Sequence, residues 1–272
     1  MFGELRMPLG IERENAVNKD LQPTTVYFNE QLPDRPKIVF FPGIVPTLKR
    51  TFLRQVMYLK TKGRNLVGFE YPNRGFNIND LENALLSVIG FDEKVSIIAS
   101  SFGTRVITEI LLKNPRLATR VNSLTLFGPF MYLDRESTLN TLASVRSAIP
   151  FPNLGLAEEL LVRYARSRFN YDPLYYSSDQ DRYAMQEEIP IEGLGARMRY
   201  FSIRPELKNT LNTYTTIVWW DREPASAAQR AKIESLCPNS NVIRIEGHHG
   251  FLQSGADSVN GILEGLISSD YM

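Results

Sequence analysis

The chain has 272 residues, and 43% of them are hydrophobic, which is enough to bury one large core. Its formal net charge is +1 and the charged residues are dispersed, so the sequence lacks the basic stripe that nucleic-acid binding requires. The lone Cys237 excludes an intrachain disulfide and a cysteine-rich zinc site, and two adjacent histidines alone make a poor metal site. We therefore expect a compact soluble protein that binds neither nucleic acid nor a metal ion.

Residues 1–6 lack the apolar core of a signal peptide, and no stretch of the chain is long and apolar enough to span a bilayer. These features predict a cytoplasmic location and no membrane span. No cofactor is expected, and nothing in the sequence indicates an oligomeric state.

Apolar runs and helical patterns alternate along the first half of the chain. The expected strands are residues 24–28, 37–41, 65–70, 94–99 and 121–127. Apolar residues at helical spacing mark two helices between these strands. The first contains Leu48, Phe52, Val56 and Leu59 and ends at Gly63, and the second contains Leu81, Leu85 and Val88 and ends at Gly90. This alternation predicts a mostly parallel central sheet with helices on both faces, and it places functional loops at the carboxyl ends of the strands.

The strand at residues 94–99 runs directly into two serines, Ser100 and Ser101. A helical pattern that stops before Pro115 follows them, with its apolar positions at Val106, Ile107, Ile110 and Leu111. A tight strand-to-helix turn of this kind can hold a serine in strained backbone geometry and present its hydroxyl above the sheet. The alternative is an ordinary connection in which the hydroxyls cap the helix.

The neighbours of the two serines distinguish between them. The turn tolerates only small side chains two positions either side of the nucleophile, and Ala99 and Gly103 meet this requirement for Ser101. Ser100 would instead have large side chains at those positions, those of Ile98 and Phe102. The motif therefore predicts Ser101 as the nucleophile.

The only two histidines, His248 and His249, follow an expected strand at residues 241–246. A serine attacks a carbonyl carbon at neutral pH only when a neutral imidazole within hydrogen-bond reach accepts its proton. We favour His249 because Gly250 and Phe251 follow it, a small residue and an apolar anchor for the next helix. His248 is the alternative base, and a solvated turn with two incidental histidines is the alternative without chemistry.

A carboxylate is needed as well, to fix the tautomer of the base and to stabilise the imidazolium that forms. Asp221 and Glu223 both follow an expected strand at residues 215–220 and precede Pro224. Each is a candidate, and each can also be explained as a surface carboxylate paired with Arg222.

Several fragments in this order resemble the α/β-hydrolase superfamily. Three of them are the serine, the acidic segment and the histidines. A fourth is Pro42-Gly43-Ile44 after the strand at residues 37–41. The fifth is the segment 69–75, Phe-Glu-Tyr-Pro-Asn-Arg-Gly, which is similar to the turn after the family's fourth strand. The order of oxyanion loop, serine, acid and histidine matches the family across most of the chain. The resemblance implies the α/β-hydrolase fold and a serine hydrolase.

The resemblance also implies roles for individual residues. The acid position of the family's turn after its seventh strand falls on Glu223, with Asp221 as the competitor and Asp134, beyond the sixth strand, as a minor alternative. The backbone N–H groups of Ile44 and Phe102 would form the oxyanion hole.

Two positions depart from the family pattern. Pro42 stands where members commonly have histidine, and Trp220 stands where they usually have glycine. Pro42 removes no donor from the oxyanion hole, but it leaves open how the loop is held.

Between Gly128 and Tyr214 the alternation of strands and helices lapses. Two amphipathic patterns lie here, Leu139, Leu142, Val145 and Ile149, then Leu156, Leu160 and Tyr164. In the resembled family an insertion at this point forms a helical lid over the serine. The expected organisation is a core of residues 1–128 and 214–272 with a lid of residues 129–213.

The inserted segment contains tyrosines and arginines that suit a binding pocket. The tyrosines are Tyr171, Tyr175, Tyr176 and Tyr183, which would line an apolar pocket or pack the lid onto the core. The arginines are Arg197, Arg199 and Arg204, for which a solvated helix face is a simpler explanation than an anionic substrate group.

The sequence thus predicts a lidded serine hydrolase that cleaves a carboxylic ester or thioester through an acyl-enzyme. The substrate would be a small acyl compound, apolar or aromatic. An acyltransferase on the same triad is the alternative within enzymes, and a non-catalytic ligand-binding member of the fold is the alternative outside them. Relatives with a carboxylate nucleophile, such as epoxide hydrolases, are disfavoured because Ser101 occupies the turn.

Overall fold

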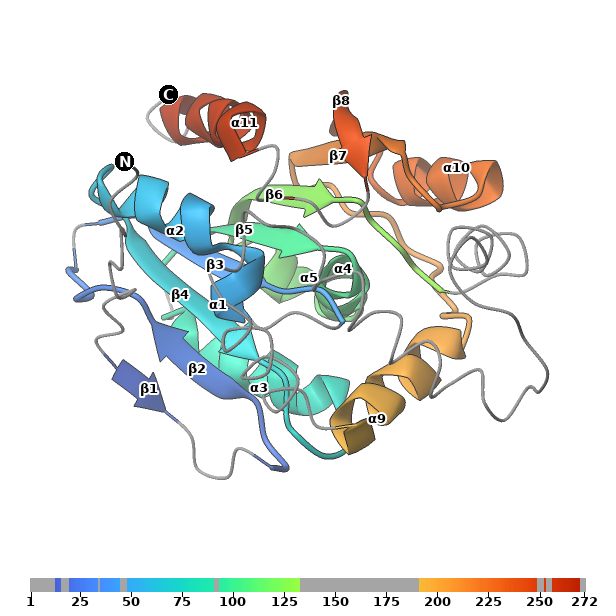
Figure 1. Ribbon diagram of the computed structural model, residues 1–272, viewed down its shortest axis with the longest axis horizontal. Helices are drawn as coiled ribbons and strands as arrows, with labels where there is room; N and C mark the ends of the chain where they lie inside the picture. The colour runs from blue at the N-terminus through green and yellow to red at the C-terminus, as the bar shows by residue number, and fades with distance from the viewer. Residues whose placement is uncertain are drawn as a thin grey trace, which may run out of the picture.

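The computed structural model describes residues 13–15, 20–33, 35–44, 48–90, 93–132, 191–248, 252 and 256–269. These residues form an eight-stranded sheet in the order β1-β2-β4-β3-β5-β6-β7-β8 (Figure 1). The strands are β1 (Arg13–Asn15), β2 (Thr24–Tyr27), β3 (Lys37–Phe41), β4 (Asn65–Glu70), β5 (Val95–Ser100), β6 (Val121–Phe127), β7 (Thr215–Arg222) and β8 (Ser240–His248).

The sheet is mostly parallel. The pairs β1–β2 and β2–β4 are antiparallel, whereas all six strands from β4 through β3, β5, β6 and β7 to β8 run parallel to one another. The carboxyl ends of β3, β5, β7 and β8 therefore lie along one edge of the sheet, where loops in parallel sheets carry function.

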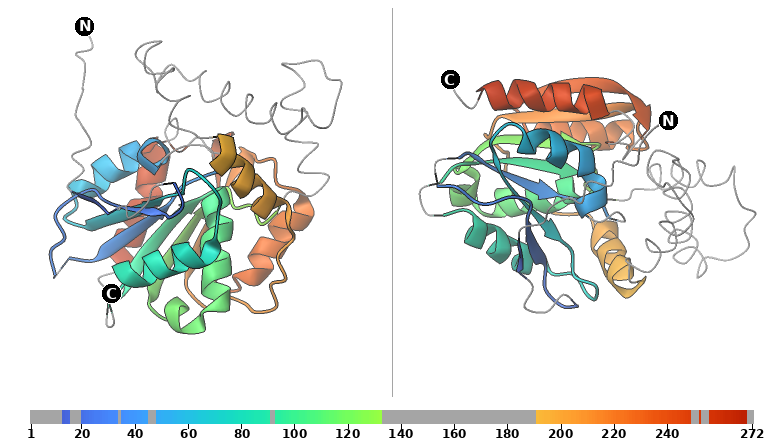
Figure 2. Two further views of the ribbon diagram at one scale, coloured as in Figure 1. Left: turned by 90° about the horizontal axis from the view of Figure 1, so that it is seen from below. Right: turned by 60° about the vertical axis from the view of Figure 1, so that its left-hand side comes forward.

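Helices cover both faces of this sheet. They are α1 (Leu48–Thr51), α2 (Leu53–Lys60), α3 (Ile78–Val88), α4 (Phe102–Lys113), α5 (Pro115–Ala118), α9 (Ile191–Ser202), α10 (Ala227–Leu236) and α11 (Ala256–Ser269). Side chains alternate along each strand, and so the sheet contributes to two separate buried clusters. In the third strand, for example, Val39 and Phe41 pack with α3 and α4, whereas Ile38 and Phe40 pack with α2 and α11. Both views in Figure 2 show the two helical layers on either side of the sheet.

The predicted fold class is confirmed, and most element boundaries lie within a residue or two of the prediction. The expected single helix from Leu48 to Gly63 is divided, because Phe52 has non-helical backbone angles between α1 and α2. The last two strands are longer than predicted, so that Asp221 lies inside β7 and His248 is the final residue of β8. The two amphipathic patterns of the expected lid lie outside the described residues.

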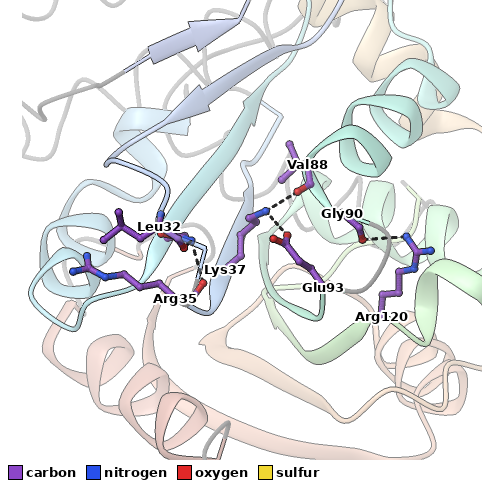
Figure 3. A network of polar contacts seen from close by, with 8 residues as sticks. Leu32, Arg35, Lys37, Val88, Gly90, Glu93 and Arg120 are labelled. Carbon is purple, nitrogen blue, oxygen red and sulfur yellow. Dashed lines mark hydrogen bonds and ion pairs between the residues drawn. The ribbon is translucent and has the colours of Figure 1, made fainter.

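Side-chain contacts to backbone carbonyls stabilise the amino ends of the strands, opposite the expected functional edge (Figure 3). Lys37 at the start of β3 donates to the carbonyl oxygen of Val88 at 2.7 Å and pairs with Glu93 at 2.5 Å. Asn65 at the start of β4 donates to the carbonyl oxygens of Leu32 and Arg35. These bonds tie loops to the amino end of the sheet.

Candidate active site

Ser101 occupies a strained turn between β5 and α4. Its backbone angles are φ +50° and ψ −117°, and it is the only non-glycine residue with positive φ in the part of the chain that the structure describes. A serine residue rarely adopts these backbone angles, and such strain persists only where the surrounding structure imposes it. Here the Ser101 N–H donates to the carbonyl oxygen of Phe127 at 2.9 Å, which continues the β5–β6 ladder into the turn.

Ser100 and Ser101 differ in access to solvent. Ser100 is the last residue of β5 and is 2% exposed, whereas Ser101 is partly exposed. The carbonyl oxygen of Ser101 accepts from the hydroxyl of Thr104, and that hydroxyl in turn accepts from the N–H of Phe130 at 3.1 Å. These two bonds join the turn to the segment that follows β6. Of the two serines, only Ser101 is exposed enough to contact a ligand.

Gly103 lets the start of α4 approach the end of β3. A Cβ atom at this position would lie 2.5 Å from the carbonyl oxygen of Pro42 and still closer to that of Phe41. Both neighbours are backbone atoms, which cannot swing aside as a side chain would. The small residue that the motif requires is thus explained by contact with the expected oxyanion loop, which places Pro42 beside the serine turn.

The expected oxyanion donors, Ile44 and Phe102, come from two neighbouring strands. Phe102 directly follows Ser101, and Ile44 lies three residues beyond the end of β3, which pairs with β5. The loop between them is held by side chains from elsewhere. The hydroxyl of Tyr71 donates to the carbonyl oxygen of Pro42 at 2.8 Å, and Arg197 donates to that of Ile44 at 2.8 Å.

The expectation of a solvated position for Arg197 is wrong. Its exposed fraction is 6%, and its guanidinium group also donates to the carbonyl oxygen of Pro72 at 3.3 Å. Arg199 and Arg204 are exposed, as expected. The sequence carried one signal for this difference: Gly193, one helical turn before Arg197, marks the face of α9 that approaches other backbone closely.

Two carboxylates lie near the end of β7, in different surroundings. Asp221 is exposed at an irregularity of the β7–β8 ladder, and it accepts from the N–H of Gly247 at 2.8 Å. Glu223 follows the strand, and both of its carboxylate oxygens are inaccessible to solvent. Asp221 thus fixes the end of β8, whereas Glu223 is directed into the protein.

Trp220 is buried against β8 and is accommodated by a glycine there. A Cβ atom on Gly247 would lie 3.2 Å from Cε3 of the indole, and Gly247 has a φ of +138°, which favours glycine. The large residue at the position where glycine is usual in the resembled family is therefore matched by a small residue on the neighbouring strand.

The structure brings four of the predicted site residues to the carboxyl edge of the sheet. Ser101, Ile44 and Phe102 lie at the ends of the adjacent strands β3 and β5, and Glu223 follows β7. The remaining predictions, His249, Asp134 and the four tyrosines at positions 171, 175, 176 and 183, lie outside the described residues. The backbone of His248 ends β8 at the same edge.

Among the residues that the structure describes, no group of three or more His, Cys, Asp or Glu residues is arranged to hold a metal ion. No helix in this part of the chain has the length and apolar character that crossing a membrane requires.

No protein-family model matches the chain, and no curated protein sequence matches it significantly. Solved structures do match over nearly their whole length. Epoxide hydrolase I from potato (Solanum tuberosum) has a TM-score of 0.64 at 16% identity, covering 94% of this chain and 99% of that one. The enol-lactonase from Burkholderia xenovorans LB400 has a TM-score of 0.64 at 13% identity, with 94% and 100% coverage.

A structure reported for the carboxylesterases of the thaumarchaeon Nitrososphaera gargenis is similar as well, with a TM-score of 0.63 at 11% identity and coverage of 94% and 98%. These three neighbours are hydrolytic enzymes with one common architecture, and at such identities the likeness concerns the fold alone. Together with the order and direction of the strands and the strained serine after β5, it shows that the chain has the α/β-hydrolase fold.

Proposed function

We propose that this protein is a serine hydrolase that cleaves a carboxylic ester or thioester through an acyl-enzyme intermediate. The observation that carries the proposal is the backbone of Ser101, which has φ +50° in a turn packed against the oxyanion loop. Strain of this size in a serine has no use in an ordinary strand-helix connection, whereas it presents a nucleophilic hydroxyl at the edge of the sheet.

In the proposed mechanism, Oγ of Ser101 attacks the carbonyl carbon while His249 accepts its proton. The carbonyl oxygen becomes an oxyanion, and the N–H groups of Ile44 and Phe102 donate to it. The tetrahedral intermediate collapses as His249 returns the proton to the leaving alcohol or thiol. Water then attacks the acyl carbon while His249 accepts its proton, and the second tetrahedral intermediate collapses as His249 returns a proton to Oγ of Ser101, which releases the carboxylic acid.

Glu223 is proposed to orient His249. The solvent-inaccessible carboxylate and the following Pro224, which restricts the turn, support this assignment. Asp221 is less suited, because its carboxylate already accepts from the N–H of Gly247. A carboxylate that holds the end of β8 is less free to follow the imidazole through its protonation cycle.

The test is labelling with a fluorophosphonate, in which the serine oxygen bonds to phosphorus and fluoride leaves. Intact mass should rise by one phosphonyl group in the wild-type protein and in Ser100→Ala, but not in Ser101→Ala. An unchanged mass of the wild-type protein, under conditions that label a control hydrolase, would favour a non-catalytic binding protein. Activity assays with water and with an added alcohol as acceptor would separate a hydrolase from an acyltransferase.

A further inference from the structure

The oxyanion loop contains a glycine at the point where its donor must be fixed. The N–H of Ile44 belongs to the peptide group between Gly43 and Ile44, and glycine permits more backbone conformations than any other residue. A donor in an oxyanion hole is useful only if it is already oriented before charge develops. Some other part of the protein must therefore restrict this loop.

Two side chains hold the peptide groups on either side of that donor. The hydroxyl of Tyr71 bonds to the carbonyl oxygen of Pro42, which belongs to the preceding peptide group. Arg197 bonds to the carbonyl oxygen of Ile44, which belongs to the following one. Because each peptide group is planar, holding the two outer groups fixes both ends of the central one, so that its N–H can move only by rotation about the axis between the flanking Cα atoms.

Tyr71 and Arg197 also contact each other. The guanidinium carbon of Arg197 lies 5.3 Å from the centre of the Tyr71 ring, a favourable distance for a cation over an aromatic face. Burial lowers the pKa of Arg197 to about 10, so the side chain keeps its charge at neutral pH. Hydrogen bonds from a charged donor are about twice as strong as neutral ones.

The helix that carries Arg197 is fixed at both ends. Near its start, a Cβ atom on Gly193 would lie 2.5 Å from the carbonyl oxygen of Asn73, so the helix rests directly on the turn after β4. At its end, the buried Arg105 donates to the carbonyl oxygens of Phe201 and Ile203, at 3.1 and 2.7 Å. Figure 1 shows α9 beside the loop that follows β4. Arg197 therefore extends from a rigid support.

We infer that Tyr71 and Arg197 are positioning residues that orient the Ile44 N–H toward the oxyanion, with Arg197 supplied by a helix about 150 residues further along the chain. The inference rests on the proposed function for the role of that N–H. It also accounts for Pro42, because the loop is held through its carbonyl oxygens and needs no side chain at that position.

The experiment compares Tyr71→Phe and Arg197→Met with two matched controls. Tyr200 touches the same aromatic rings, Phe76 and Phe102, but its hydroxyl donates to Glu109 instead of the loop. Arg199 is two residues from Arg197 on the same helix and is exposed. The controls are therefore Tyr200→Phe and Arg199→Met, assayed in full-length protein beside the wild type.

With an activated ester, Tyr71→Phe and Arg197→Met should each lower kcat by about 10-fold to 100-fold while KM changes little, because a misplaced donor affects the transition state most. The inhibition constant of a trifluoromethyl ketone, whose adduct carries an oxyanion, should rise by the same factor. Arg197→Lys should recover part of kcat, since it keeps a charged donor. Both controls should retain the wild-type kcat, even if Tyr200→Phe melts at a lower temperature.

Unchanged kcat and inhibition constants in both test variants, or an equal loss in Tyr200→Phe, would overturn the inference. If Arg197→Met does not fold, Tyr71→Phe decides. The NMR order parameter of the Ile44 N–H provides a readout independent of turnover, and it should fall in Tyr71→Phe but not in Tyr200→Phe. Absence of Ser101-dependent turnover in the wild type would refute the proposed function, while the order parameter would still confirm or reject the positioning.

Discussion

The two halves of the proposed functional edge are built differently. At the ends of β3 and β5, main-chain atoms are held in place: the strained turn at Ser101, the close approach at Gly103, and the carbonyl oxygens that accept from the side chains of Tyr71 and Arg197. At the ends of β7 and β8, position is set by side chains on a more open strand. From Val242 to Gly247 the residues of β8 alternate between exposed and half-buried, and Asp221 is exposed.

The two halves should therefore tolerate substitution to different degrees. A backbone donor or a strained turn needs particular small residues, because no side chain can move out of the way. A carboxylate and an imidazole act through the positions of their side-chain atoms, and several local sequences can provide those positions. The region around Trp220 illustrates this, because the large indole is matched by Gly247 across the ladder. We therefore expect changes in the size of neighbouring residues to cost more on the β3–β5 side than on the β7–β8 side, whereas removing a group of the proposed mechanism should be costly on either side.

The largest effect is expected from Ser101→Ala. Removing a triad serine costs about 10⁶-fold in kcat in the best-studied precedent. Ser100→Ala should keep most activity, because Ser100 is 2% exposed at the end of β5. Initial rates on short activated esters measure both. The opposite ranking of the two variants would show that the serine motif is shifted by one residue.

His249→Ala should cost nearly as much, because no other group is expected to accept the serine proton. The base must be neutral, and an ordinary imidazole titrates near pH ~6.5. The wild-type kcat/KM should therefore fall toward acid pH with one histidine-like midpoint, and His248→Ala should keep the same profile. Full activity in His249→Ala with loss in His248→Ala would assign the base to the last residue of β8.

Glu223→Gln should lower kcat by about 10⁴-fold, the loss found when a triad acid is changed to its amide, with little change in the melting temperature. Asp221→Asn should be nearly silent, because the amide oxygen still accepts from the N–H of Gly247. Asp221→Ala removes that acceptor and should show a modest loss. If Asp221→Asn is the crippling change, Asp221 is the acid, and if neither amide matters, Asp134 is the next to test.

Gly103→Ala should destabilise the protein by about 3 kcal/mol, because its Cβ would meet backbone oxygens that cannot move aside. Gly261→Ala is the matched control. Gly261 lies inside α11 with open space around it, so alanine there should stabilise by about 0.5–1 kcal/mol. Denaturant unfolding measures both. Equal stabilities of the two variants would contradict the close contact between the serine turn and the oxyanion loop.

The smallest effect concerns the thiol of Cys237, which lies at the amino end of β7, away from the site. Burial raises the pKa of Cys237 to about 11, although a hydrogen bond with Thr215 opposes the shift. At pH 8 the reactive thiolate is therefore only about 10⁻³ of the thiol. A disulfide reagent should react slowly with the native protein and rapidly after unfolding. Rapid reaction of the native protein would show that the amino end of β7 is open to solvent, as Asp221 near its carboxyl end is.

The sequence was most informative where the pattern is local. The strands β3, β4 and β6 match the predicted residues, because each is a short apolar run bounded by turn residues. It was less informative where tertiary contacts extend or interrupt an element. Asp221 joins β7 through pairing with β8, and Phe52 interrupts the helix predicted from Leu48 onward.

The linear order of residues was sufficient to predict the mostly parallel sheet with helices on both faces and the tight turn at Ser101. Both follow from periodicity and from the sizes of adjacent side chains, which the linear order contains. The contacts that hold the proposed oxyanion loop could be seen only in the folded protein. Arg197 meets Ile44 and Tyr71 across more than 120 residues, and its helical spacing fits a solvated face equally well. The physical reason is that burial of a long polar side chain depends on which backbone carbonyls the fold brings within its reach, and no local pattern records that.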